Sequence, residues 1–104
     1  MSTIKYVEDM YRDDYYPTVL VDRVKNLLEQ VEAVLKTGET DEQLIQQAFD
    51  QAVMGINDLA EAFDEQGSEI ETVARESIAE TVFQMIDEYN IQTDIEELLR
   101  ERDW

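Results

Sequence analysis

Residues 40–65, TDEQLIQQAFDQAVMGINDLAEAFDE, carry a long and uninterrupted helical pattern. Apolar side chains recur there at spacings of three and four residues, the period of an amphipathic α-helix. The apolar positions are Leu44, Ile45, Ala48, Phe49, Ala52, Val53, Ile56, Leu59, Ala60 and Phe63. This apolar face is broad and includes Gly55. Because a glycine inside a helix costs about 1 kcal/mol relative to alanine, we expect another helix to cross closely at Gly55.

The same period continues on both sides of this stretch, and no segment alternates as a β-strand would. Pro17, Gly38 and Gly67 interrupt the pattern and separate the helices. Three Ser or Thr residues precede a Gln or Glu by three positions, which predicts capping boxes at helix starts. These residues are Thr40, Ser68 and Thr93.

The predicted helices therefore cover residues 3–12, 18–37, 40–65 and 68–89, with a last short helix from residue 93. A chain of 104 residues is long enough for one modest core. We predict an all-α fold in which residues 1–104 form a single-domain helical bundle. It has three long helices and short helices at the N- and C-terminal ends.

Charge is concentrated in one part of the chain. The whole sequence has a net charge of −18, and residues 37–99 contain 17 Asp or Glu against one basic residue, Arg75. Lys and Arg drive duplex binding by neutralising phosphates, so this surface predicts no nucleic-acid partner. Anionic membrane surfaces are disfavoured for the same reason. A positively charged protein is the partner that this charge favours.

The residue inventory excludes several chemistries. The chain has no Cys and no His, so it lacks a thiol nucleophile, an imidazole base and the usual zinc ligands. No stretch approaches the ~20 apolar residues that span a membrane, and the N-terminus has no secretory pattern. We expect a cytoplasmic protein with no cofactor and no bound metal.

Three blocks of the sequence, at residues 11–25 (YRDDYYPTVLVDRVK), 67–80 (GSEIETVARESIAE) and 95–104 (IEELLRERDW), occur in that order. Together they resemble a family of small acidic bacterial proteins known as a domain of unknown function. The resemblance covers most of the chain. It implies a bacterial, cytoplasmic protein of this length, complete in itself. It implies no activity and assigns no catalytic or binding residue.

The acidic helical surface is the first candidate site. Asp50, Asp58, Glu61 and Asp64 are its candidate partner-binding residues. Such a charge block is commonly a solvated face that keeps a protein soluble. An ordinary soluble surface mixes both signs, however, and almost no Lys is interspersed here. Docking of a basic protein and simple solvation both remain open.

Tyrosines near the N-terminus form the second candidate site. Four of the five tyrosines lie between Tyr6 and Tyr16, and tyrosine is enriched at interfaces. Tyr11 and Tyr15 are the residues that we expect to contact a partner. The alternative is an arm that folds back and closes one end of the bundle. An arm that folds back onto the bundle could also contact a partner, so the two interpretations are compatible at a homodimer interface.

Arg75 lies at the edge of the apolar face of its helix. A lone arginine among acids, partly buried, predicts a structural ion pair with carboxylates of neighbouring helices.

Two pairs of carboxylates have helical spacing: Glu29 with Glu32, and Glu61 with Asp64. Such motifs resemble the magnesium-binding helices of all-α nucleotide pyrophosphatases, because magnesium takes a few converging carboxylates together with phosphate. No cluster of Lys or Arg accompanies them to hold a triphosphate.

The sequence therefore favours a non-enzymatic protein-binding protein, in one version an immunity-type or inhibitor protein that covers a cationic site. One alternative is a magnesium-dependent phosphohydrolase that uses the helix carboxylates. The other is a self-associating structural protein.

Overall fold

The computed structural model describes residues 4–104, and these form five helices without a strand. The helices are α1 (Glu8–Arg12), α2 (Thr18–Lys36), α3 (Glu42–Glu65), α4 (Thr72–Glu88) and α5 (Ile95–Leu98). The predicted all-α fold, with three long helices and a short helix at each end, is confirmed. The predicted first helix was too long, because α1 begins at Glu8; its expected start at residue 3 lies outside the described residues.

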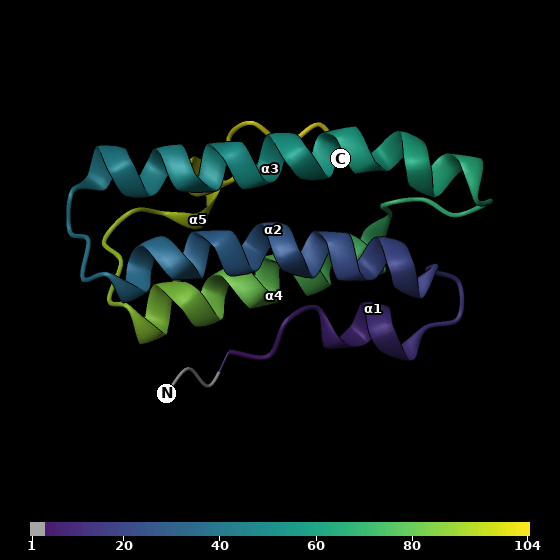
Figure 1. The fold of residues 1–104 in the computed structure, drawn as a ribbon, viewed down its shortest axis with the longest axis horizontal. Helices are drawn as coiled ribbons and strands as arrows, with labels where there is room; N and C mark the ends of the chain where they lie inside the picture. Colours follow the sequence, from purple (N-terminus) through teal and green to yellow (C-terminus); the bar gives the residue numbers. More distant parts are fainter. Residues whose placement is uncertain (1–3) are drawn as a thin grey trace.

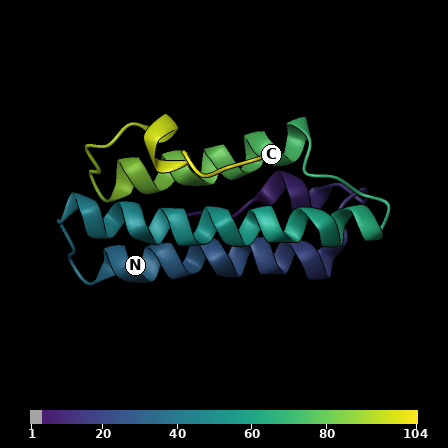
Figure 2. The same ribbon diagram turned by 90° about the horizontal axis from the view of Figure 1, so that it is seen from above.

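The helices are arranged in two layers. Helices α2 and α3 run antiparallel and form one layer (Figure 1). Figure 2 shows α4 and α5 together on one side of this pair. Helix α1 packs against α4 and α2. No helix of residues 4–104 covers the opposite face of the α2–α3 pair (Figure 2).

The core lies between the two layers and draws on all five helices. Its largest fully buried side chains include Met10, Leu28, Phe49, Phe63 and Met85. Burial of apolar side chains of this size contributes roughly 1.5–3 kcal/mol each and is the main stabilising term.

The caps of two helices lie one residue later than predicted. The Asp41 carboxylate caps α3 and accepts hydrogen bonds from the N–H groups of Gln43 and Leu44 at 2.8 and 3.4 Å. Asp94 caps α5 by accepting from the Glu96 N–H at 3.2 Å. The predicted caps at Thr40 and Thr93 were wrong, because a neighbouring aspartate is favoured at the cap and its negative charge suits the helix dipole.

The predicted start of α4 at Ser68 was also wrong, since α4 begins at Thr72. Ser68 instead completes the end of α3. Gly67 adopts a φ of 76°, and the Ser68 N–H donates to the Phe63 carbonyl at 2.9 Å. This is the Schellman arrangement of a helix C-terminus. Ser68 is buried in that role, so residues 68–71 form a connection.

The segment before α1 is fixed to α4. The backbone of Lys5 exchanges two hydrogen bonds with the side-chain amide of Gln84, at 2.9 and 3.0 Å. The Val7 N–H donates to Thr81 Oγ1 at 3.0 Å. Val7 has a φ of 40°, which is uncommon for a β-branched residue and is strained. These contacts hold Val7 in that conformation.

Gly55 lies where α2 crosses α3 closely, as predicted. A Cβ atom at this position would lie 2.9 Å from both Leu27 methyl carbons. Nothing larger than glycine fits unless Leu27 moves.

Replacing Gly55 with alanine is expected to stabilise the protein by about 0.5–1 kcal/mol when Leu27 is also alanine, and by less when Leu27 is present. Alanine favours the helix, but in the native background the displaced Leu27 offsets that gain. Urea unfolding of both single variants and the double variant measures the coupling. If Gly55→Ala has the same effect in both backgrounds, the contact with Leu27 does not limit this position.

Candidate functional site: the outer surface of α3 and its surroundings

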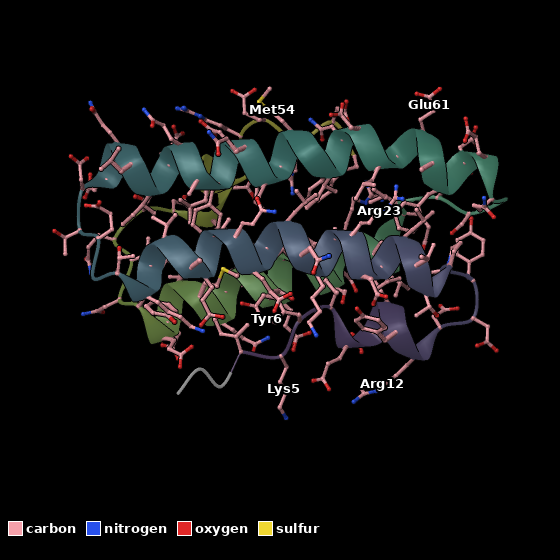
Figure 3. The ribbon with its side chains drawn as sticks, in the orientation of Figure 1. Lys5, Tyr6, Arg12, Arg23, Met54 and Glu61 are labelled. Atoms are coloured by element: carbon pink, nitrogen blue, oxygen red, sulfur yellow. The ribbon has the colours of Figure 1, made fainter. Side chains whose placement is uncertain are left out.

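The outer surface of α3 is strongly acidic. Six Asp or Glu and no Lys or Arg lie within Glu42–Glu65. Asp58, Glu61 and Asp64 are exposed, as a partner-binding surface requires. Glu61 and Met54 project away from the body of the protein (Figure 3). In the described part of the chain no Lys or Arg lies within ion-pair distance of Asp58, Glu61 or Asp64. Their charges are therefore available to a partner.

Asp50 has a different environment from the other three predicted residues. Arg100 Nη2 and Nε donate to its two carboxylate oxygens, at 2.7 and 3.2 Å. Gln46 Nε2 donates to the same carboxylate at 2.9 Å. This bidentate pair joins α3 to the turn that follows α5. The carboxylate of Asp50 is thus engaged inside the protein and is a structural group.

The ion pair is expected to hold the C-terminal segment in place. Replacing Arg100 with glutamine should lower the melting temperature and speed amide hydrogen exchange in residues 95–99, because both hydrogen bonds to Asp50 are lost. Arg75→Gln is the matched control, since the described residues place no carboxylate within ion-pair distance of Arg75. Equal exchange rates in the two variants would show that the Asp50–Arg100 pair does not secure α5.

Arg75 does not make the predicted ion pair. It is exposed, and Nη2 donates to Thr72 Oγ1 at 3.3 Å. Among the described residues no carboxylate lies within 4.0 Å of its guanidinium. The helical wheel placed Arg75 at the edge of the apolar face, but in the described structure that edge is exposed to solvent.

The N-terminal tyrosines fold back onto the bundle through carboxylates. Tyr6 donates to Glu32, Tyr16 donates to Glu71, and Tyr11 donates to Asp22 at 2.6 Å. In each case burial is the largest cause that raises the tyrosine pKa above its usual value, followed by the hydrogen bond to the carboxylate. The arm therefore folds back along α2 and α4 (Figure 1), and it does not close one end of the bundle as the alternative interpretation expected.

Tyr11 and Tyr15 still present part of their rings to solvent. They are 38% and 44% exposed. The Tyr15 ring packs edge-on against Tyr16, with centroids 5.2 Å apart. Both rings are positioned by the arm and are accessible, so contact with a partner stays a prediction for them.

The carboxylates proposed for magnesium do not form one site. Glu29 is exposed, whereas Glu32 is 3% exposed and accepts hydrogen bonds from Tyr6 and Tyr89. Among residues 4–104 there is no group of three or more His, Cys, Asp or Glu side chains that could hold a metal ion. Glu29 and Glu32 therefore do not share one site, because Glu29 faces water and Glu32 lies under the tyrosine arm.

An apolar groove on the uncovered face of the α2–α3 pair was not predicted. It has a volume of about 300 Å³ and is lined by Arg23, Asn26, Leu27, Gly55 and Leu59. A helix that packs on only one side needs only a narrow stripe of apolar residues. The apolar face of residues 40–65 is broader than that, and this breadth could have indicated the groove.

Fold and surface together define a small all-α protein that carries an acidic helical surface beside an open apolar groove. The chain belongs to a family of unknown function, DUF5713, which it matches over residues 1–104. This confirms the resemblance to a domain of unknown function. No curated protein and no solved structure matches the chain. In the described residues, every helix is too short or too polar to cross a membrane.

Proposed function

We propose that this protein is a non-enzymatic binding protein of the cytoplasm, and that the acidic surface of α3 engages a basic partner protein. The observation that carries the proposal is the exposure of Asp58, Glu61 and Asp64 without a nearby cation in the described structure. Asp50, on the same helix, differs from these three acids because Arg100 already pairs with it. The three exposed acids are left for another molecule or for water.

Electrostatics would act mainly on the rate and selectivity of binding. A surface of one sign steers an oppositely charged protein and speeds association at low salt. It also repels acidic proteins and nucleic acid. An inhibitor that covers the cationic site of a nuclease or toxin is a concrete form of this function, and it needs no catalytic residue.

Replacing Asp58 and Glu61 with lysine is expected to abolish capture of the partner and to leave the fold intact. The double substitution raises the net charge from −18 by four units on one exposed turn. Exposed substitutions change stability by less than ~0.5 kcal/mol. Affinity purification from the native host, followed by mass spectrometry, compares it with the wild-type protein. Association with the identified partner should slow about tenfold or more at low salt, and the loss should shrink as salt rises.

The matched control places the same charge change on α4. Glu76 and Glu80 are both exposed, and Glu76→Lys with Glu80→Lys should keep the partner. If the Asp58→Lys, Glu61→Lys protein captures every wild-type partner at low salt, the acidic surface of α3 is a solvated face only.

A further inference from the structure

A polar notch lies between the first half of α3 and the segment that contains α5 (Figure 2). Its volume is about 440 Å³, which is in the size range of small-molecule sites. Gln46 is its most buried lining residue, at 9% exposed, and forms its floor. Glu42, Thr93, Glu97 and Arg100 are among the residues that border it. We call this depression the α3–α5 notch.

The amide of Gln46 is only half satisfied by the protein. Nε2 donates to Asp50 Oδ1 at 2.9 Å and to the Glu97 carbonyl at 3.0 Å, so both amide hydrogens are used. These acceptors also fix the orientation of the amide, because a flipped side chain would turn Oε1 toward two other oxygens. Among the described residues no group donates to Oε1, and Oε1 is not sealed from solvent. An acceptor that is held in place and lacks a donor therefore faces the notch.

The strongest donors near the notch are already occupied, which disfavours an anion. All three Arg100 nitrogens donate to carboxylates, to Asp50 at 2.7 and 3.2 Å and to Glu97 at 3.1 Å. The first N–H groups of a helix bind anions when they are uncapped. Here those of α3 and α5 donate to the capping carboxylates of Asp41 and Asp94. An anion would therefore meet carboxylates without a free cation to bind it.

The charges of the notch favour a cation. Asp50 and Glu97 share the single positive charge of Arg100. Glu42 has no Lys or Arg within ion-pair distance in the described chain, so negative charge is in excess. Among residues 4–104 no three acidic side chains are placed to hold a metal ion, which needs several such ligands. A cation that carries its own N–H donors needs only hydrogen-bond acceptors.

An adjoining depression supplies apolar surface. Its volume is about 210 Å³, and it shares Glu42 and Thr93 with the α3–α5 notch. Ile45 and Ile91 line it, and in the described structure its charged lining residues, Glu39 and Glu42, are both acidic. A ligand with a cationic head and a short aliphatic chain matches the two depressions, because the head finds acceptors and the chain covers the isoleucines.

We propose that the α3–α5 notch binds a primary alkylammonium group. The ammonium donates to Gln46 Oε1 and to the carboxylates of Glu42 and Glu97, and its aliphatic chain lies over Ile45 and Ile91. An ammonium is compact and carries three donors on a slender chain, so it can reach the buried amide oxygen. A free polyamine and a lysine side chain of another protein both present this group. The site does not involve the three exposed acids of the proposed function, so the two stand independently.

Three small probes separate hydrogen bonding from simple charge attraction. n-Butylammonium has the charge and the N–H donors, n-butyltrimethylammonium has the charge and chain without donors, and n-butanol has no charge. In an NMR titration at constant ionic strength, n-butylammonium should shift the side-chain amide signals of Gln46 in a saturable way. The other two should bind about tenfold more weakly, the effect of losing a charged hydrogen bond. Equal binding of n-butyltrimethylammonium would show attraction by the net charge of −18 alone and overturn the proposal.

Matched variants of α3 locate the binding. Glu42→Gln should weaken binding of n-butylammonium about fivefold, because a charged acceptor is lost. Glu61→Gln makes the same change on the outer surface of α3 (Figure 3) and should change binding by less than about twofold. Gln46→Leu removes the amide oxygen and should abolish binding, with Gln51→Leu on the exposed side of α3 as its control. Thermal melts establish that each variant is folded, and the Glu42 pair keeps the test decisive if Gln46→Leu is not. Equal effects of Glu42→Gln and Glu61→Gln would overturn the proposal.

Two further ligands distinguish the sources of the ammonium at matched ionic strength. Spermidine represents a free polyamine, and lysine blocked at its amino and carboxyl ends represents a side chain of another protein. Tighter binding of spermidine assigns the notch to a polyamine, and tighter binding of the blocked lysine assigns it to a protein side chain. If no ammonium probe shifts the Gln46 amide signals, the inference is overturned. The proposed function would still stand, because it rests on Asp58, Glu61 and Asp64.

Discussion

Replacing Glu32 with alanine is expected to lower the free energy of unfolding by about 2–3 kcal/mol. The Glu32 carboxylate is buried between α2 and the N-terminal arm, and it accepts hydrogen bonds from the hydroxyls of Tyr6 and Tyr89. Alanine removes the acceptor of both hydroxyls and leaves a cavity beneath them. A buried polar group that loses its acceptor costs ~1–3 kcal/mol. Chemical unfolding followed by circular dichroism measures the change.

Two further variants separate hydrogen bonding from packing. Glu32→Gln retains one oxygen acceptor and similar volume, so it should cost less than Glu32→Ala. Replacing Tyr6 and Tyr89 with phenylalanine removes the hydroxyls, and Glu32→Leu should cost less in that background than in the native one, because those two donors no longer lose an acceptor. If Glu32→Ala costs the same with and without the two hydroxyls, the effect comes from the cavity and the hydrogen bonds contribute little.

Raising the pH above about 10 is expected to unfold the protein cooperatively. Tyr6, Tyr11 and Tyr16 have pKa values raised above the 10.0 of a free tyrosine, first by burial and then by their carboxylate partners. The folded state therefore favours the neutral phenol. The stability that follows from this is fully present below pH ~10, the unfolded pKa, and is lost as the pH rises toward the higher folded values. Absorbance at 295 nm and ellipticity at 222 nm should change together.

Phenylalanine at Tyr6, Tyr11 and Tyr16 provides the control for alkaline unfolding. This triple variant no longer ionises in the arm, so its helical content should persist to higher pH than that of the wild-type protein. Salt is held constant, because the net charge of −18 also becomes more negative as the pH rises. Gradual ionisation of all five tyrosines, with helical content unchanged, would contradict the prediction.

The helices could be predicted from sequence because their determinants are local. Apolar spacing and the glycines at 38 and 67 gave the number, type and approximate length of the long helices. The cap positions were less accurate, since Thr40 and Asp41 are both good cap residues and only the folded backbone selects between them. Gly55 was informative because glycine destabilises the interior of a helix, so its presence there indicated close packing against another helix.

The site depended on contacts between distant residues, which sequence spacing does not reveal. Asp50 meets Arg100 from a position 50 residues away, so its structural role could not be read from its own helix. Glu32 follows Leu28 by one helical turn and thus lies on the apolar stripe of α2. This position indicated that Glu32 is buried, but the chain has so many acids that Glu32 did not stand out. Arg75 was misjudged because a helical wheel gives direction along one helix and does not show where the neighbouring helices end.

The attachment of the N-terminal segment to α4 has a consequence for the order of folding. Its hydrogen bonds join residues 74 and 79 positions apart, Val7 with Thr81 and Lys5 with Gln84. During synthesis α2 and α3 leave the ribosome before α4 and can pair while α4 is still unmade. The first segment must then wait for the return of the chain, and contacts this distant in sequence form slowly. A nascent α2–α3 hairpin therefore carries Glu32 without its hydrogen bond from Tyr89, and the turn at Val7 receives its hydrogen bond from Thr81 only after α4 has formed.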